Sequence, residues 1–85
     1  MPTISMFYGI VIMMYHDDHN PPHFHARYQG FNASFTFDGE LLKGEMPRKQ
    51  HQLITAWARI HQDELIANWD LAKEEEQLFR INPLQ

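Results

Sequence analysis

The chain has 85 residues, of which 7 are basic and 11 acidic, so its formal net charge is −4. This length allows one domain over residues 1–85 and excludes a multidomain enzyme. The negative charge does not favour RNA or an anionic membrane as a broad partner, although it allows a small local site for RNA.

The composition predicts a folded protein that benefits from association. Hydrophobic residues make up 44% of the chain and aromatic residues 13%, which is typical of a globular domain. A domain this small buries only about 60% of its unfolded surface. The chain also has no cysteine that could form a disulfide. We therefore expect a homodimer or a protein partner.

The first structural signal is an apolar run at residues 7–15, FYGIVIMMY. The run is too apolar to alternate, so it predicts a central strand that is covered on both faces. Helices can cover only one of these faces, and we expect a protein partner on the other. Nine residues are too few to cross a bilayer, which needs about 20, and no basic residue precedes them, so the sequence predicts a cytoplasmic protein without a membrane partner.

A hairpin follows the polar connection at residues 16–22. Residues 23–29 and 31–38 both alternate between apolar and polar side chains, and Gln29-Gly30 between them is a two-residue turn signal. In that register Ala26 faces Ala33 on the core side. On the polar side, His25 faces Ser34 and His23 faces Thr36.

The rest of the chain predicts one more strand and two helices. Asp38-Gly39 is a turn signal that leads into a short strand at residues 40–43. A helical pattern begins at Pro47 and continues to about Glu76, with a break near residues 61–63 where Asp63 could cap the second helix. Residues 78–84 are expected to be extended and to add a short edge strand.

Together these elements predict an α+β domain. Its small antiparallel sheet has three to four strands, and two C-terminal helices pack on one face of the sheet.

The most informative segment is a histidine cluster, because four of the six histidines lie at residues 16–25. His23 and His25 share one face of a strand, which places their backbones roughly 6.5–7 Å apart. His19 and Asp18 on the preceding loop could complete a ligand set, and His16 is a further candidate. Such nitrogen-rich sets bind zinc, nickel, copper or iron, so the segment predicts a transition-metal site.

Two other interpretations of these residues remain open. Imidazoles close together can act as base and acid, which makes His19, His23 and His25, with Arg27 stabilising a phosphate, the catalytic residues of a small ribonuclease. Ser34, Thr36 or Tyr28 would then position the phosphate. Alternatively the histidines are structural and bond across the sheet to Ser34 and Thr36.

Several motifs together resemble one bacterial family, known as domain of unknown function 4160. They are H-N-P-P-H-F-H-A-R-Y at 19–28, E-M-P-R-K at 45–49, W-A-x-I-H-x-D-E-L-x-x-N-W at 57–69 and I-N-P-L at 81–84. The resemblance implies a small stand-alone prokaryotic protein, often encoded beside another small protein in an arrangement like that of toxin–antitoxin modules. The residues that match the family signature are His19, Asn20, Pro21, Pro22, His23, His25 and Tyr28.

These observations lead to two functional hypotheses. The first is an interaction component of a toxin–antitoxin-like pair, which acts through the apolar first strand and the acidic second helix and whose enzymatic form is a histidine-dependent ribonuclease. Its partner is a cognate small protein. The alternative is a transition-metal-binding domain that uses His19, His23 and His25.

Overall fold

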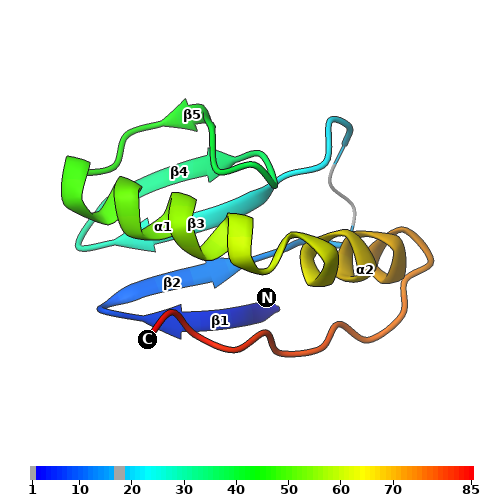
Figure 1. Ribbon diagram of the computed structural model, residues 1–85. Coiled ribbons are helices and arrows are strands. Elements are labelled where there is room, and N and C mark those ends of the chain that lie inside the picture. Colours follow the sequence, from blue (N-terminus) through cyan, green and yellow to red (C-terminus); the bar gives the residue numbers. More distant parts are fainter. Residues whose placement is uncertain (1, 17–18) are drawn as a thin grey trace.

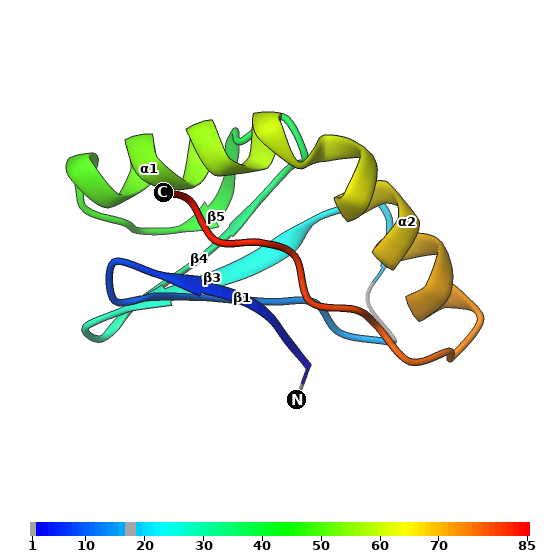
Figure 2. The same ribbon diagram turned by 60° about the horizontal axis from the view of Figure 1, so that its bottom comes forward.

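The computed structural model describes residues 2–16 and 19–85. Its elements in chain order are β1 (Thr3–Phe7), β2 (Ile10–Met13), β3 (Phe24–Tyr28), β4 (Phe31–Phe35), β5 (Leu41–Gly44), α1 (Arg48–Ile60) and α2 (Gln62–Lys73). Within the described residues the strands form one antiparallel sheet in the order β1-β2-β3-β4-β5. Both helices lie on one side of it (Figures 1 and 2). The predicted α+β fold is therefore confirmed, with five described strands where the sequence predicted three to four.

The single strand predicted at residues 7–15 is wrong in its bounds. Tyr8 and Gly9 have φ angles of 49° and 79° and form a two-residue turn. This turn divides the apolar run between two strands of a hairpin, β1 and β2. Turns of this kind favour Asn, Asp or Gly at the first position, so a tyrosine there conceals the turn in the sequence. The second half of the run is an interior strand, β2, as predicted.

The face of β2 that points away from the core is covered only in part. Ile10 and Ile12 are buried in the core, and Met13, on the other face, is only 3% exposed. Tyr15 contacts Met13, because its hydroxyl donates a hydrogen bond to the methionine sulfur at 3.7 Å. Val11 on the same face is only partly buried, and its neighbour Met6 on β1 is 54% exposed, so a partner on this face stays a prediction.

The second hairpin matches its prediction. Tyr28 pairs with Phe31, Ala26 with Ala33 and His25 with Ser34. His23 lies just before β3 and Thr36 just after β4, so the predicted pair falls outside the two strands. The strand predicted at residues 40–43 is found at Leu41–Gly44 as β5, and a bulge interrupts its pairing with β4.

The helices break where the sequence predicted. α1 and α2 meet at His61, and this residue rather than Asp63 is the N-cap of α2, without a side-chain hydrogen bond. α2 ends at Lys73, before the predicted end near Glu76.

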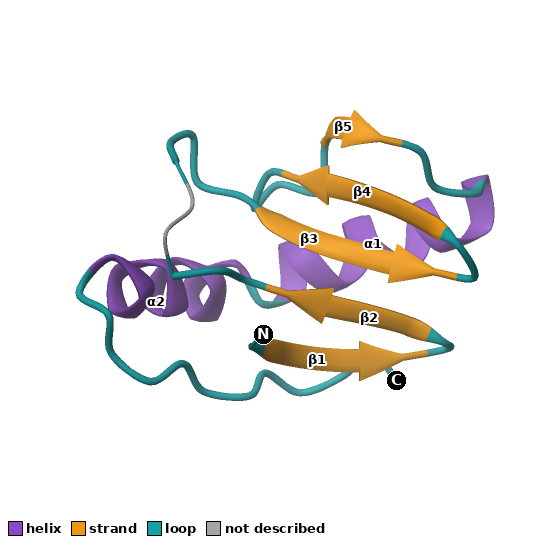
Figure 3. Ribbon diagram, turned by 180° about the vertical axis from the view of Figure 1, so that it is seen from behind, coloured by secondary structure: helices purple, strands orange, loops and turns teal. Residues whose placement is uncertain are grey.

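The C-terminal residues 77–85 run back along β1 (Figures 1 and 3), and we name them the C-terminal strap. No residue of the strap is in a strand, so the predicted edge strand is not found there. Hydrogen bonds attach the strap instead. Ile81 N–H donates to the Ile4 carbonyl at 2.7 Å, and Trp57 Nε1–H donates to the Asn82 carbonyl at 2.9 Å.

The core lies between the sheet and α1 and is rich in aromatic side chains. Trp57 is fully buried, and its ring contacts Phe7 and Phe24 at centroid distances of 5.4 and 5.6 Å. Phe24 stacks on Phe35 in the neighbouring strand at 5.7 Å. These contacts lie on the face of the sheet that is turned towards α1. None of the helices in the described chain has the length and apolar character that spanning a bilayer requires.

Candidate functional site

The polar face of the sheet is turned away from α1 and is seen directly in Figure 3. The alternation of β3 places His25 and Arg27 on this face, and the alternation of β4 adds Asn32 and Ser34. His25 pairs with Ser34, and Ser34 pairs with Lys43 on β5. One row across three neighbouring strands therefore carries an imidazole, a hydroxyl and an ammonium group.

A groove of about 270 Å³ lies over these residues, and we name it the open-face groove. Arg27 and Lys43 supply two cations to its lining, and the described residues that line it include no carboxylate. The complete lining is Met13, Tyr15, His25, Ala26, Arg27, Asn32, Ala33, Ser34, Lys43 and Gly44. The groove is thus locally positive in a chain whose formal net charge is −4.

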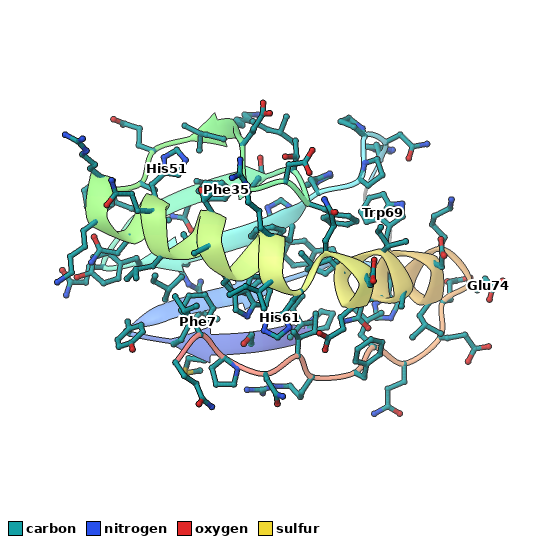
Figure 4. All side chains as sticks on the ribbon, in the orientation of Figure 1. Phe7, Phe35, His51, His61, Trp69 and Glu74 are labelled. Carbon is teal, nitrogen blue, oxygen red and sulfur yellow. The ribbon has the colours of Figure 1, made fainter. Side chains whose placement is uncertain are left out.

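An aromatic row extends from the groove around the start of β3 towards α2. The ring of His25 lies edge-on to Tyr15 at 4.7 Å and edge-on to His23 at 5.1 Å. The ring of His23 in turn contacts Trp69 of α2 at 5.6 Å. Figure 4 shows Trp69 on α2, on the side of the helix towards the connection between β2 and β3. The row fixes the orientation of both imidazoles.

The proton position on His23 follows from its backbone contact. Nδ1 of His23 lies 2.7 Å from the Pro21 carbonyl oxygen, which can only accept a hydrogen bond. Nδ1 must therefore carry the proton in the neutral ring. Because Pro21 belongs to the polar connection at residues 16–22, this bond also ties the end of that connection to the start of β3.

The structure separates the predicted site residues into two groups. His25 and Arg27 line the open-face groove, and His23 contacts His25 from beside it. His19 is exposed on the connection between β2 and β3 and is absent from the groove lining. His16 is turned elsewhere, because its Nε2 bonds the carbonyl of Glu76 beyond α2 at 2.9 Å.

The predicted metal site has no complete ligand set among the described residues. No three of their His, Asp or Glu side chains come close enough to hold a metal ion. Asp18 lies outside the described residues, so the set that includes Asp18 with His19, His23 and His25 stays a prediction.

Sequence reasoning missed several groove residues for different reasons. Asn32 was already on the polar side of the predicted hairpin, and its opposition to Arg27 gave a usable signal. Lys43 pairs with Ser34 in the register that a two-residue turn at Asp38-Gly39 also gives, but the predicted register was not extended to this strand. Tyr15 was assigned to a strand, whereas it lies just after β2 and covers Met13.

A comparison with protein-family models gives a match for this chain. Neither the curated proteins nor the solved structures yielded a match to this chain. The family model described as "Domain of unknown function (DUF4160)" matches residues 9–70, which include β2 to β5, α1 and most of α2. The match covers the strands that line the groove and all members of the aromatic row. The chain therefore belongs to this family, as its motifs predicted.

Proposed function

We propose that the chain is a binding component of a toxin–antitoxin-like pair and that its open-face groove binds single-stranded RNA. Arg27 and Lys43 contact phosphates, while Asn32 and Ser34 offer hydrogen bonds. The toxin–antitoxin-like role comes from the family resemblance. The cognate small protein, or a second copy of this chain, remains the expected protein partner.

The observation that carries the RNA proposal is the local charge of the groove. Two cations line it, and the described lining has no carboxylate to compete for them. Ligand binding responds to the potential inside a concave site more than to net charge, since such sites focus the field of the groups that line them. A phosphodiester therefore finds a favourable site on an otherwise acidic protein.

The shape and chemistry of the face support a single strand over a duplex. Proteins that bind single-stranded nucleic acid combine a positive groove with aromatic side chains on which bases stack. Tyr15 lines the groove beside His25, and Asn32 lies opposite Arg27 in the strand register. A groove of about 270 Å³ has room for parts of one or two nucleotides rather than for a helix.

The proximity of His23 and His25 favours an enzymatic form of the same proposal. One imidazole would take the proton of a ribose 2′-hydroxyl as its oxygen attacks the adjacent phosphorus, and the other would give a proton to the departing 5′-oxygen. The products would be a 2′,3′-cyclic phosphate and a 5′-hydroxyl. Arg27, two residues along β3 from His25, would stabilise the charge on the phosphate.

Binding is tested with a labelled oligoribonucleotide of about 12 nucleotides in fluorescence anisotropy. We expect the double variant Arg27→Ala, Lys43→Ala to bind at least about tenfold more weakly, since it loses two phosphate contacts. Lys73→Ala with Arg80→Ala is the matched control, because it removes the same charge from exposed positions that do not line the groove. Equal loss in both variants, or no binding by the wild-type protein, would contradict the proposal.

Cleavage is tested separately on a denaturing gel. We expect His25→Ala to abolish formation of the cyclic phosphate, whereas His19→Ala retains it because His19 neither lines the groove nor belongs to the aromatic row. Intact RNA after incubation with the wild-type protein would reject the ribonuclease and leave the binding proposal standing. Loss of cleavage in His19→Ala would instead support the catalytic set predicted from the sequence, in which His19 acts together with His23 and His25.

A further inference from the structure

A second cleft lies at the end of the sheet where the two hairpins turn, on the side of α1. Its volume is about 460 Å³, and Tyr8, Tyr28, Lys49, Gln50 and Leu53 line it. The turn between β1 and β2, the turn between β3 and β4 and the start of α1 all lie at this end of the molecule (Figures 1 and 3). None of these residues lines the open-face groove, so the cleft is a separate feature.

Tyr8 is the unusual residue of the cleft. Its φ of 49° places it in the left-handed region, where a residue with a large side chain is uncommon. Asn, Asp or Gly would fit this first turn position with less strain. The ring gains little burial in return, because Tyr8 is 60% exposed. Because this strained and exposed side chain also lines the cleft, it points to a role in binding.

Tyr28 supplies a second, better-anchored ring. It is partly buried and packs against the hydrophobic core. A Cβ added at Gly9 would lie 3.4 Å from Cε1 of Tyr28, so the backbone of the first turn rests on the edge of this ring. The turn that presents Tyr8 is thus held in place beside Tyr28.

The lining selects the chemistry of the ligand. Two tyrosine rings and Leu53 favour a planar, largely apolar group, while Lys49 disfavours a cation and attracts an anion. Gln50 adds an amide that can donate and accept hydrogen bonds. We propose that this cleft binds a purine nucleotide, with the base against the tyrosine rings and the phosphate at Lys49.

The test uses adenosine monophosphate as the probe and intrinsic fluorescence as the readout. We expect Tyr8→Asn to weaken binding about tenfold or more, in line with the loss of one stacking contact. Asn suits the turn better than Tyr, so the melting temperature of this variant should equal or exceed that of the wild type. A lower melting temperature together with lost binding would overturn the proposal, because the ring would then be structural.

The second hairpin provides a matched control. Gln29 occupies the equivalent turn position with φ of 42° and does not line the cleft. Gln29→Asn should therefore keep the melting temperature at or above the wild-type value and leave nucleotide binding unchanged. Equal loss of binding in both asparagine variants would overturn the proposal.

The role of Lys49 and the source of the ligand are tested in the same assay. Lys49→Met should reduce the preference for adenosine monophosphate over adenosine by about three- to fivefold, as expected for an exposed charge. An unchanged preference would remove the phosphate from the proposal and so overturn it.

The source of the nucleotide follows from a comparison of two ligands. If Tyr8→Asn weakens binding of oligoadenylate as well as of adenosine monophosphate, the nucleotide is a unit of RNA. If Tyr8→Asn weakens binding of the monophosphate alone, the ligand is a free nucleotide. Either result supports the site, and neither depends on the open-face groove, because the groove residues are unchanged in these variants.

Discussion

At the residue scale, Gly44 shows why a glycine must end β5. Its φ is 88°, and a Cβ at this position would lie 2.2 Å from the carbonyl oxygen of Asn32. That carbonyl also accepts a hydrogen bond from Glu45 N–H at 3.1 Å. The close approach joins β5 to β4 and so helps to set the position of Lys43 in the groove.

We predict that Gly44→Ala lowers the free energy of unfolding by about 3 kcal/mol, because it combines left-handed strain with a clash against backbone. Gly30→Ala is the control, since Gly30 has nearly the same φ, 87°, and open space around its Cβ position. It should lose only about 1 kcal/mol, which is the cost of the backbone conformation alone. The measurement is urea unfolding of both variants. Equal losses would show that the contact with Asn32 is unimportant.

The candidate site was predictable from the sequence only where a side chain follows strict alternation. His25 and Arg27 were found because they occupy alternate positions of a clean hairpin strand. Lys43 lies opposite Ser34, as a two-residue turn at Asp38-Gly39 would place it, but the predicted register ended at the hairpin and did not include the last strand. His19 was placed in the site by its proximity in sequence, yet the path of a loop does not follow from periodicity.

At the scale of elements, the C-terminal strap depends on one buried side chain of α2. Asn68 is fully buried, donates from Nδ2 to the Phe79 carbonyl at 2.9 Å and accepts from Phe79 N–H at 3.0 Å. Its amide thus pairs with the backbone of the strap as a neighbouring strand would. Beyond this point Ile81 continues to the Ile4 carbonyl on β1.

We predict that Asn68→Ala releases the strap and costs about 2 kcal/mol of stability, because both bonds to Phe79 are lost. Hydrogen exchange at the Ile81 amide should become faster as its bond to Ile4 opens more often. Asp70→Ala, an exposed change on the same helix, should alter stability by less than about 0.5 kcal/mol. Unchanged protection of Ile81 in Asn68→Ala would show that the strap is held by its apolar contacts.

The sequence predicted the elements whose local signals agree and missed the others. The hairpin at Gln29-Gly30 and the break between the helices were found because turn chemistry and hydrophobic phase both mark them. The first hairpin was read as one strand because Tyr8 replaces the usual turn residue inside a continuous apolar run. The strap lacks a periodic signal, because its path is fixed by bonds from Asn68 and Trp57 to its backbone and by one backbone bond to Ile4.

At the scale of the whole molecule, the net charge and the open-face groove act in opposite directions. The formal charge of −4 repels a nucleic acid at long range, whereas Arg27 and Lys43 attract its phosphates inside the groove. Salt screens the long-range repulsion over about 8–10 Å at moderate ionic strength. The dependence of binding on salt therefore reports how many phosphates the protein contacts directly.

We predict that the logarithm of the dissociation constant for single-stranded RNA rises with the logarithm of salt concentration with a slope of about 1.4, since each phosphate contact to a single strand contributes about 0.7. Arg27→Ala should lower the slope by about 0.7, and Lys73→Ala should leave it unchanged. Anisotropy titrations over a series of salt concentrations measure both values. A steeper slope that Arg27→Ala does not alter would place the RNA on another surface. The next candidate is a further groove on α1, whose lining includes Arg48 and Arg59.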